Sequence, residues 1–479
     1  MELGKGKAQK KVCQQPLERL RIGQEGLMRR YIFLIVILAF GVFWSVAGHT
    51  ADRYVAPAGT NAGGCLDSAN PCRTIQYAVD ASAANDTIHV AAGTFTENVT
   101  IDVTLTLSGA GASLTTVDGS QSGTVILVII APPNSGTATI SGMTLTNGSE
   151  CGILGAESSL IVTDCVITGN NTTNEGGAIY AWAGAPVPSL TLRNTTIADN
   201  TAFLGGGIAS RFGTALVENC TISGNTAQLQ GGGIANWVGS DMTVVNSTVS
   251  GNVAQEEGGI ANDGTLRLIN TTITGNRSQG SPGGGVESSD GTATLRNTLI
   301  AGNQASSGAD CSGTLQSEGY NLIEDTSGCT LTGILTGNIT GQDPLLGPLA
   351  DNTGPTKTHE LLAGSPAIDA GNPAGCTDEN GMPLLTDQRG SPRPVDCGGG
   401  LRCDIGAFEA CNGAGPQPTV YESANPDMAG AVAVGTASSS PYDHSPGVGS
   451  RLYYKVDDGH GVPAVIKLVK GGLGILIYF

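Results

Sequence analysis

The sequence predicts an all-β chain whose central part is a solenoid of stacked coils. Residues 160–311 repeat a short Asn-led pattern, and the leading Asn residues are spaced by 25, 27, 24 and 27 positions. A repeat length in the twenties, with β-branched centres and Gly-rich turns, is typical of a solenoid. Gly, Thr, Ser, Asn, Val and Ile are plentiful and helix formers are scarce, which also favours strands. The leading series is Asn194, Asn219, Asn246, Asn270 and Asn297.

Stacking gives each repeat position a role. An apolar column is expected inside the coils, formed by Ile167, Ile197, Ile222, Val249, Ile273 and Ile300. The leading Asn series is expected inside as a second column, in which each side-chain amide bonds the next. A second Asn follows each leading Asn by six residues, and this series and the glycines are expected at the bends, where positive φ is needed. Arg193 and Glu218 share a repeat position and are expected to form a surface ion pair of little energetic weight.

Residues 1–51 have the pattern of a targeting segment. Arg29 and Arg30 precede an apolar run at 31–48, and small residues close it at Ser45 and Ala47. This arrangement predicts a cleaved secretory signal, with Met28 as an alternative start. The alternative is an uncleaved anchor, because about 18 apolar residues can span a bilayer. Both interpretations place the rest of the chain outside the membrane, and the chain contacts the membrane through this segment only if the segment is uncleaved.

The net charge and the cysteine content exclude some kinds of partner and site and favour an exported protein. The formal net charge is −18, which argues against nucleic acid as a partner because phosphate neutralisation needs a basic face. Twelve Cys suit an exported chain with disulfides, and their spacing is not that of a zinc site. Cys65 and Cys72 are expected to form a disulfide, whereas the pairing among 376–411 is left open. Cys165 and Cys220 lie two rungs apart, roughly 9–10 Å, and are expected to be reduced and inward-facing.

The beginning of the solenoid carries a specific family resemblance. Residues 74–81 form an amphipathic helix signal that is expected to cover the first rung. The stretch CRTIQYAVD, followed by DTIHVAAGTFTENVTI, resembles the start of right-handed parallel β-helix proteins of the pectin-lyase-like superfamily. The GGGI and SGN repeats resemble those of polymorphic outer-membrane proteins on bacterial surfaces. The resemblance implies a single-stranded right-handed parallel β-helix over 52–350, with roughly ten rungs at about 4.8 Å each.

The chain after 350 departs from the repeat. In residues 351–411, GSPAIDAG, DQRGSPRP and DIGAFE resemble the choice-of-anchor Q domain, which implies a C-terminal capping block. Its charged residues are expected to form a hydrogen-bonded clasp that holds the cap; a calcium site or active centre is the alternative. Residues 412–479 are expected to form a small β-rich module. The charged set is Asp369, Asp387, Arg389, Asp404 and Glu409.

Function is less determined than fold. The superfamily resemblance implies a polysaccharide lyase or a glycoside hydrolase, which needs a basic residue or clustered carboxylates. No Lys occurs between Tyr54 and Ala350, and the coil carboxylates are expected to scatter over turns without pairing across adjacent rungs. We therefore assign no catalytic residue, metal or cofactor, and calcium is left open. Trp182, Phe212 and Trp237 near the turns are candidates for stacking on sugars, with packing under loops as the alternative. The first hypothesis is a secreted or cell-surface bacterial scaffold for adhesion or carbohydrate contact, and the second is a lyase or hydrolase.

Overall fold

The computed structural model describes residues 50–130, 136–182, 189–280, 282–395 and 402–410, together with five strands between Thr419 and Tyr478. Residues 1–49 of the expected targeting segment lie outside the described residues, as do Cys397 and Cys411. No helix in these ranges is long and apolar enough to cross a membrane.

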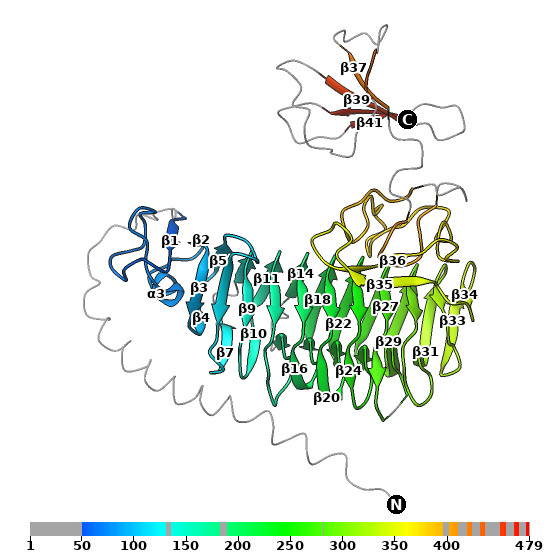
Figure 1. The fold of residues 1–479 in the computed structure, drawn as a ribbon, viewed down its shortest axis with the longest axis horizontal. Coiled ribbons are helices and arrows are strands. Elements are labelled where there is room, and N and C mark those ends of the chain that lie inside the picture. The colour runs from blue at the N-terminus through cyan, green and yellow to red at the C-terminus, as the bar shows by residue number, and fades with distance from the viewer. Residues whose placement is uncertain are drawn as a thin grey trace, which may run out of the picture.

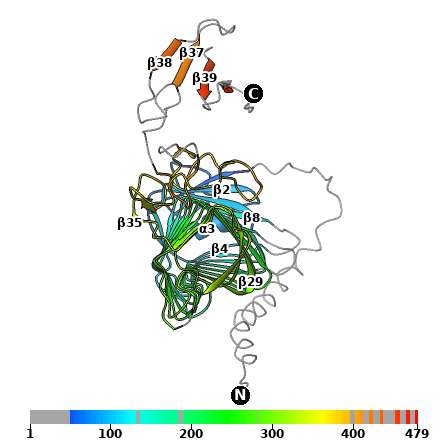
Figure 2. The same cartoon turned by 90° about the vertical axis from the view of Figure 1, so that its right-hand side faces the viewer.

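The described chain is an all-β right-handed solenoid in which parallel strands stack rung on rung (Figure 1). A 19-stranded sheet bends at β29 (Val286–Arg296), because this long strand pairs with both β25 and β26. Its two arms are called face 1 and face 2, and a separate eleven-stranded sheet is called face 3. The three faces enclose one interior, which Figure 2 shows along the stack.

Face 1 comprises β1 (Asp52–Val55), β2 (Asp86–Val90), β5 (Leu105–Gly109), β8 (Thr137–Ser141), β11 (Ser159–Thr163), β14 (Ser189–Arg193), β18 (Gly213–Glu218), β22 (Ser240–Val245), β26 (Thr265–Ile269), β29, β31 (Cys311–Glu318) and β33 (Cys329–Ile334). Face 2 comprises β4 (Val99–Ile101), β7 (Thr124–Val128), β10 (Cys151–Ala156), β13 (Ile179–Trp182), β17 (Ile208–Arg211), β21 (Ile234–Asn236), β25 (Ile260–Asn262) and the start of β29.

Face 3 comprises β3 (Gly93–Thr96), β6 (Thr115–Asp118), β9 (Thr144–Thr146), β12 (Val166–Thr168), β15 (Thr196–Ala198), β19 (Thr221–Ser223), β23 (Thr248–Ser250), β27 (Thr272–Thr274), β30 (Leu299–Ala301), β32 (Leu322–Ile323) and β34 (Ile339–Thr340). A small fourth sheet joins faces 3 and 2 on four rungs: β16 (Thr201–Leu204), β20 (Thr226–Gln230), β24 (Val253–Ala254) and β28 (Arg277–Ser278). Face 3 has eleven strands and face 2 has eight, so the expected ten rungs differ slightly from either count.

The interior confirms the expected apolar column and corrects the expected Asn column. Every member of the Ile/Val column is fully buried. The leading Asn residues, however, form one bond of the expected kind, from Asn297 Nδ2 to Asn270 Oδ1 at 2.6 Å. They sit at positive φ between faces 1 and 3, for example 54° at Asn219, and do not form the continuous ladder. The buried ladder is the second series, in which Asn225 Nδ2 donates to Asn252 Oδ1 at 3.0 Å. The ladder is Asn170, Asn200, Asn225, Asn252, Asn276 and Asn303.

The N-terminal end of the stack is covered as expected. Helix α3 (Ile75–Asp80) begins after Thr74, whose hydroxyl accepts a hydrogen bond from the Tyr77 N–H and so caps the helix. Ile75, Ala78 and Val79 are buried in the same hydrophobic core as the coils, and Figure 2 shows α3 across the end of the interior. Cys65 and Cys72 form a disulfide beside β1. Cys165 and Cys220 are buried and unbonded, in agreement with the register argument.

Residues 351–395 and 402–410, called the flank block, lie along the side of the solenoid rather than across its C-terminal opening. After β34, the chain forms the antiparallel pair β35 (Leu346–Ala350) and β36 (Thr358–Leu361) and returns over the later rungs (Figure 1). Gln388 shows the docking: it is fully buried, its Nε2 donates to Thr221 Oγ1 at 3.0 Å, and its Oε1 accepts from Thr248 Oγ1 at 2.6 Å. The block therefore covers the outer surface of face 3 from β19 to β30.

The last five strands form an antiparallel sheet of their own. The order is β38-β37-β39-β40-β41. Their bounds are β37 (Thr419–Ser423), β38 (Val432–Gly435), β39 (Arg451–Val456), β40 (Ala464–Leu468) and β41 (Leu476–Tyr478).

Candidate functional site

The sequence-selected aromatic residues lie where face 2 turns into face 1. Trp182 ends β13, Phe212 follows β17 and Trp237 follows β21. Trp182 pairs with Arg211 on the next rung, and Ser210 pairs with Asn236, so Trp182, Arg211 and Trp237 form one outward column. We call Trp182, Arg211, Phe212 and Trp237 the aromatic flank.

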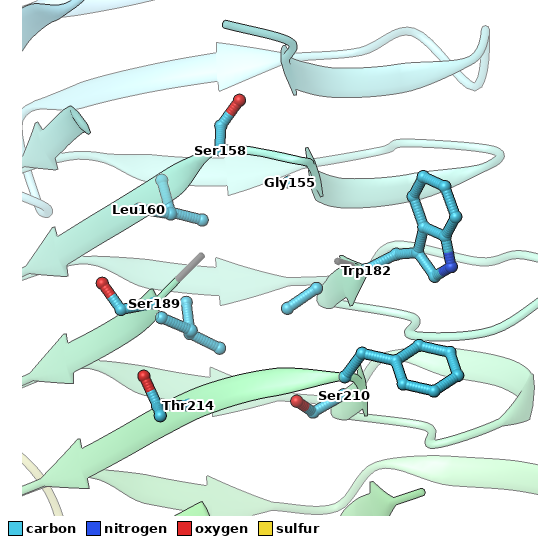
Figure 3. Close-up of a pocket in the computed structure, with 10 residues that line it drawn as sticks. Gly155, Ser158, Leu160, Trp182, Ser189, Ser210 and Thr214 are labelled. Atoms are coloured by element: carbon cyan, nitrogen blue, oxygen red, sulfur yellow. The ribbon is translucent and has the colours of Figure 1, made fainter. Parts of the chain in front are cut away.

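The members of the aromatic flank differ in exposure. Phe212 is 50% exposed, whereas Trp237 is only 9% exposed. The Phe212 ring lies over Gly239 of the next rung, where a Cβ would stand 2.5 Å from ring atom Cδ1. Trp182 borders a shallow hollow of about 10 Å³, lined also by Phe212, Ser158 and Ser189 (Figure 3). Phe212 is therefore the ring that the flank presents most openly.

Arg211 fixes the middle of this flank. Its Nε donates to Glu175 Oε2 at 2.6 Å and its Nη2 to Glu175 Oε1 at 2.7 Å, a bidentate pair. Its guanidinium carbon also lies 5.0 Å from the Trp237 ring centroid, within reach of a cation–π contact. Trp237 and Arg211 are thus held as one rigid unit.

A second feature of face 2 was missed by the sequence analysis. Five successive turns lead into strands β13, β17, β21, β25 and β29 of this face. On four of them the stacked residue is a glycine with φ between 62° and 88°, namely Gly176, Gly205, Gly231 and Gly283. The fourth of the five rungs carries Glu257 instead, at φ 49°. Left-handed backbone disfavours residues with a side chain, so this rung accepts strain that its neighbours avoid.

The strands beside this turn leave room for the Glu257 side chain. The outward position of face 2 is Ala209, Ala235 and Ala261 on three successive rungs, and Glu287 on the next. Asn262 pairs with Asn236 of the previous rung, so Asp263 occupies the position that Trp237 holds one rung earlier in the outward column. We call Glu257, Asp263, Glu287 and Asp290 the acidic corner.

The electrostatics show that these carboxylates interact. Burial, followed by the charges of Glu287, Glu256 and Asp263, raises the pKa of Glu257 to about 8. Burial and neighbouring acids also raise the pKa values of Asp263 and Glu287. The charges of Glu257 and Glu287, on adjacent rungs, therefore influence each other, a relationship that the sequence analysis did not identify. The repeat register did contain the signal, because Glu257 replaces the first Gly of the GGGI motif.

The flank block gathers its five selected charged residues around one cluster. Arg389 Nη2 contacts Asp387 Oδ2 at 2.6 Å, and its guanidinium lies 3.6 Å from the Phe408 ring centroid. Asp387 also accepts from Glu409 N–H, and Asp404 accepts from Asp369 N–H at 2.7 Å. The cluster thus joins residues that are far apart in the block's sequence, as a clasp would.

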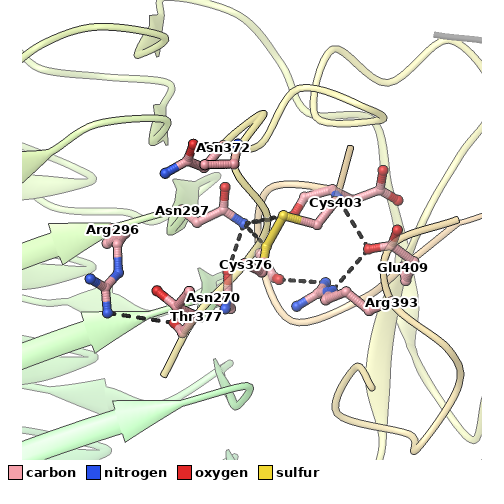
Figure 4. Close-up of a disulfide and its surroundings, with 12 residues drawn as sticks. Asn270, Arg296, Asn297, Asn372, Cys376, Thr377, Arg393, Cys403 and Glu409 are labelled. Atoms are coloured by element: carbon pink, nitrogen blue, oxygen red, sulfur yellow. Dashed lines mark hydrogen bonds and ion pairs between the residues drawn. A yellow bond between two sulfur atoms is a disulfide. The ribbon is translucent and has the colours of Figure 1, made fainter. Parts of the chain in front are cut away.

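Arg393 completes this cluster and was not selected from the sequence. Its Nε lies 2.8 Å from Glu409 Oε2, both side chains are almost fully buried, and its Nη1 donates to Asn246 Oδ1 of the solenoid (Figure 4). Nearby, the Cys376–Cys403 disulfide packs against Asn297. Burial and the charge of Glu409 raise the pKa of Asp404 to about 7. These contacts attach the block to the coils.

No group of three or more His, Cys, Asp or Glu within the described ranges is arranged to hold a metal ion. An open groove of about 180 Å³ lies on the outer surface of face 1, lined by Thr191, Thr214, Thr243, Asp241, Arg267 and, from the flank block, Glu379. In it, Arg267 Nη1 pairs with Asp241 Oδ1 at 2.5 Å.

Comparison with known proteins supports the architecture. A family model described as a right-handed β-helix region matches residues 128–305. No curated protein matches the chain in sequence. The solved structure of pectate lyase Pel9A covers 76% of this chain and 97% of its own, with 15% identity and a TM-score of 0.48. A rhamnogalacturonan lyase covers 66% and 96%, with 10% identity and a TM-score of 0.34. The pectin methylesterase from Aspergillus niger covers 62% and 88%, with 17% identity and a TM-score of 0.27. At these identities and TM-scores the solved structures carry no statement about family or function, and the family model identifies a right-handed β-helix region within the chain.

Proposed function

We propose that this chain is an extracytoplasmic β-helix scaffold that contacts carbohydrate through the aromatic flank without turning it over. The observation that carries the proposal is Phe212, a half-exposed ring held at positive φ beside Trp182 and Arg211. Positive φ is uncommon at a bulky residue, and strained backbone positions of this kind cluster at binding and active sites. Three disulfides, at 65–72, 311–329 and 376–403, support an oxidising location.

Three arginines of the coils are poor candidates for the base of a lyase. Arg193, Arg211 and Arg267 each pair with a carboxylate, at Glu218, Glu175 and Asp241. A paired guanidinium is stabilised in its charged form, and a lyase base must instead accept a proton.

The experiment measures retention of the full chain on a panel of neutral, uronate-containing and amine-bearing polysaccharides. Phe212→Ala is expected to lower affinity for the retained polysaccharide by roughly tenfold, about 1.4 kcal/mol. Phe203→Ala is the matched control, because Phe203 is also exposed but lies on β16, away from the flank. Equal loss in both variants, or no retention at all, would refute the proposal.

A glycoside hydrolase is the second candidate, and the acidic corner favours it. A carboxyl with a pKa of about 8 beside other carboxylates has the protonation needed of a general acid. The same panel, assayed for new reducing ends, separates the two functions. Turnover that disappears in Glu257→Gln would establish the hydrolase and overturn the scaffold.

A further inference from the structure

The two ends of the solenoid are closed to different degrees. Helix α3 lies across the N-terminal end, and its apolar residues belong to the hydrophobic core of the coils. At the opposite end the last rung is formed by β33 and β34 (Figure 1), and no residue from 326 to 343 is buried. Ile334 is 58% exposed and Leu335 is 52% exposed. Within the described residues, the C-terminal end of the interior is therefore uncovered.

Strand β33 is an open edge of face 1. Within the described part of the chain it pairs with β31 alone, over six residue pairs. A strand in a parallel ladder bonds its neighbour through alternate residues only. Because the Gly313 N–H donates to the Gly328 carbonyl, the N–H and C=O of Leu331 point away from β31, past the last rung. These groups are placed to receive a further strand.

The last rung lacks the usual protection of a strand edge. Soluble proteins keep such edges from pairing with charged side chains or proline. Residues 326–342 contain no Asp, Glu, Lys, Arg or Pro, although the whole chain has 41 acidic and 23 basic residues. Leu331 and Cys329 pack against the core but are only partly buried. The end therefore combines free backbone groups with apolar side chains, which suits another uncharged strand.

Charge favours a second copy of this chain as that partner. The formal net charge is −18, so two copies repel each other across most of their surfaces. A two-fold axis places a surface against its own image, and a surface without charge can meet its image without repulsion. The last rung meets this condition. Head-to-tail stacking is blocked because α3 covers the N-terminal end, so the contact closes as a dimer.

The topology also keeps the rest of the two copies apart. Antiparallel pairing reverses the strand direction, so face 3 of the second copy continues from face 2 of the first. The flank block docks on face 3. The two flank blocks therefore lie on opposite sides of such a dimer and do not meet.

We propose that β33 pairs antiparallel with β33 of a second copy, joining two solenoids end to end through their C-terminal rungs. Each Leu331 donates its N–H to the Leu331 carbonyl of the other copy, as in a hydrogen-bonded antiparallel pair. The pairing extends face 1 across the two-fold axis and covers the open interior of both copies. It does not use the aromatic flank and is independent of carbohydrate contact.

Sedimentation of the full chain with its disulfides intact tests the proposal. A reversible dimer is expected, and small-angle scattering should show a particle lengthened along the stack. Hydrogen exchange should find the Leu331 amide protected in the dimer and exposed after dilution. A chain that stays monomeric at about 100 μM would overturn the proposal. A monomer with a protected Leu331 amide would also overturn it, because residues of the same chain would then cover the edge.

Variants assign the contact to β33. In the proposed register Thr330 and Thr332, both exposed, face each other across the axis. The double variant Thr330→Lys, Thr332→Lys places like charges opposite each other and should raise the dimer dissociation constant roughly tenfold or more. The double variant Thr330→Asp, Thr332→Asp should do the same. Thr292→Lys, at an exposed threonine on an inner rung of face 1, is the matched control and should leave the dimer unchanged.

Mixing the basic and acidic double variants separates a lost contact from a lost fold. The opposite charges then face each other, so a mixed dimer is expected to form. Dimers that persist in both double variants would show that the copies meet elsewhere and would overturn the proposal. Two folded double variants that remain monomeric in the mixture would equally refute pairing through β33.

Discussion

Asn225 and Asn252 are joined twice across adjacent rungs: the Asn225 backbone N–H and its Nδ2 both donate to Asn252 Oδ1 at 3.0 Å. Asn252 makes the same two bonds to Asn276, and its Nδ2 also reaches the Ile222 carbonyl. All these groups are buried. Because each ladder side chain bonds buried backbone groups of a neighbouring rung, the ladder helps to set the register of the stack.

Replacing a ladder residue is therefore expected to be costly. Asn252→Ala leaves the Asn225 N–H without its partner and removes three further buried bonds, from Asn225 Nδ2, to Asn276 Oδ1 and to the Ile222 carbonyl. Each unsatisfied buried group costs roughly 1–3 kcal/mol. The free energy of unfolding, measured by urea denaturation, should fall by about 3 kcal/mol or more.

Asn194→Gly is the control for this change. Asn194 belongs to the leading series, has φ 48°, and makes an exposed bond to Asp164. Glycine tolerates that φ, so stability should change by less than about 1 kcal/mol. Similar losses in the two variants would contradict the role given to the second Asn series.

The two Asn series show what periodicity predicts and what it does not. The repeat length and the Ile/Val column were enough to predict the solenoid, because stacked coils place similar residues at equivalent positions. Both Asn series have the same period, however, and Asn suits either a buried ladder or a positive φ. Only the path of the chain decides between these roles, and the assignment made from the pattern was reversed.

The candidate site likewise contains some residues that the sequence identified and others that only the structure revealed. Trp182, Phe212 and Trp237 could be selected from the sequence because they interrupt Gly-rich turns. Glu257 was treated as one more turn carboxylate, since its meeting with Glu287 depends on which loop positions stack. The flank block could be recognised by its motifs, but its position depends on contacts such as Gln388 with Thr221, between residues 167 positions apart.

Glu257 should make stability depend on pH. Its pKa is about 8 in the folded chain against an ordinary 4.5, so the folded state binds this proton more tightly. The stability that the proton contributes is present below pH 4.5 and is lost as pH rises towards 8. Glu257→Gln should therefore show a shallower fall in the free energy of unfolding across this window, whereas Glu218→Gln should follow the unmodified chain. Identical slopes for all three proteins would contradict the burial of this carboxyl.

The described cysteines should divide into two chemical classes. Peptide mapping without reduction is expected to recover the pairs Cys65–Cys72, Cys311–Cys329 and Cys376–Cys403. Cys151, Cys165 and Cys220 are buried, and burial raises the pKa of each thiol to about 12. Thiolate is the reactive form, so a thiol reagent should label these three only after denaturation. Labelling of any of these three thiols in the native protein would show that the rung that contains it unfolds locally.

Docking of the flank block should weaken as pH rises from about 4 to 7. Asp404 is buried, and burial with the charge of Glu409 raises its pKa from 3.8 to about 7. The proton on this carboxyl therefore favours the folded block, and its contribution is lost as pH approaches 7. Arg393 limits the effect, because it pairs with Glu409 and lowers the pKa of Asp404.

Hydrogen exchange, corrected for intrinsic rates, can test this coupling within one molecule. The Gly406 and Ala407 amides bond to Asn297 and Thr272 of the solenoid, so their protection reports docking. Strand β12 on face 3 precedes the covered rungs and supplies an internal reference. Protection at 406–407 should fall relative to β12 between pH 4.5 and 7.5. Asp404→Asn keeps an acceptor for the Asp369 N–H and cannot titrate, so it should flatten this dependence. An unchanged pH dependence in that variant would show that Asp404 is not the titrating group.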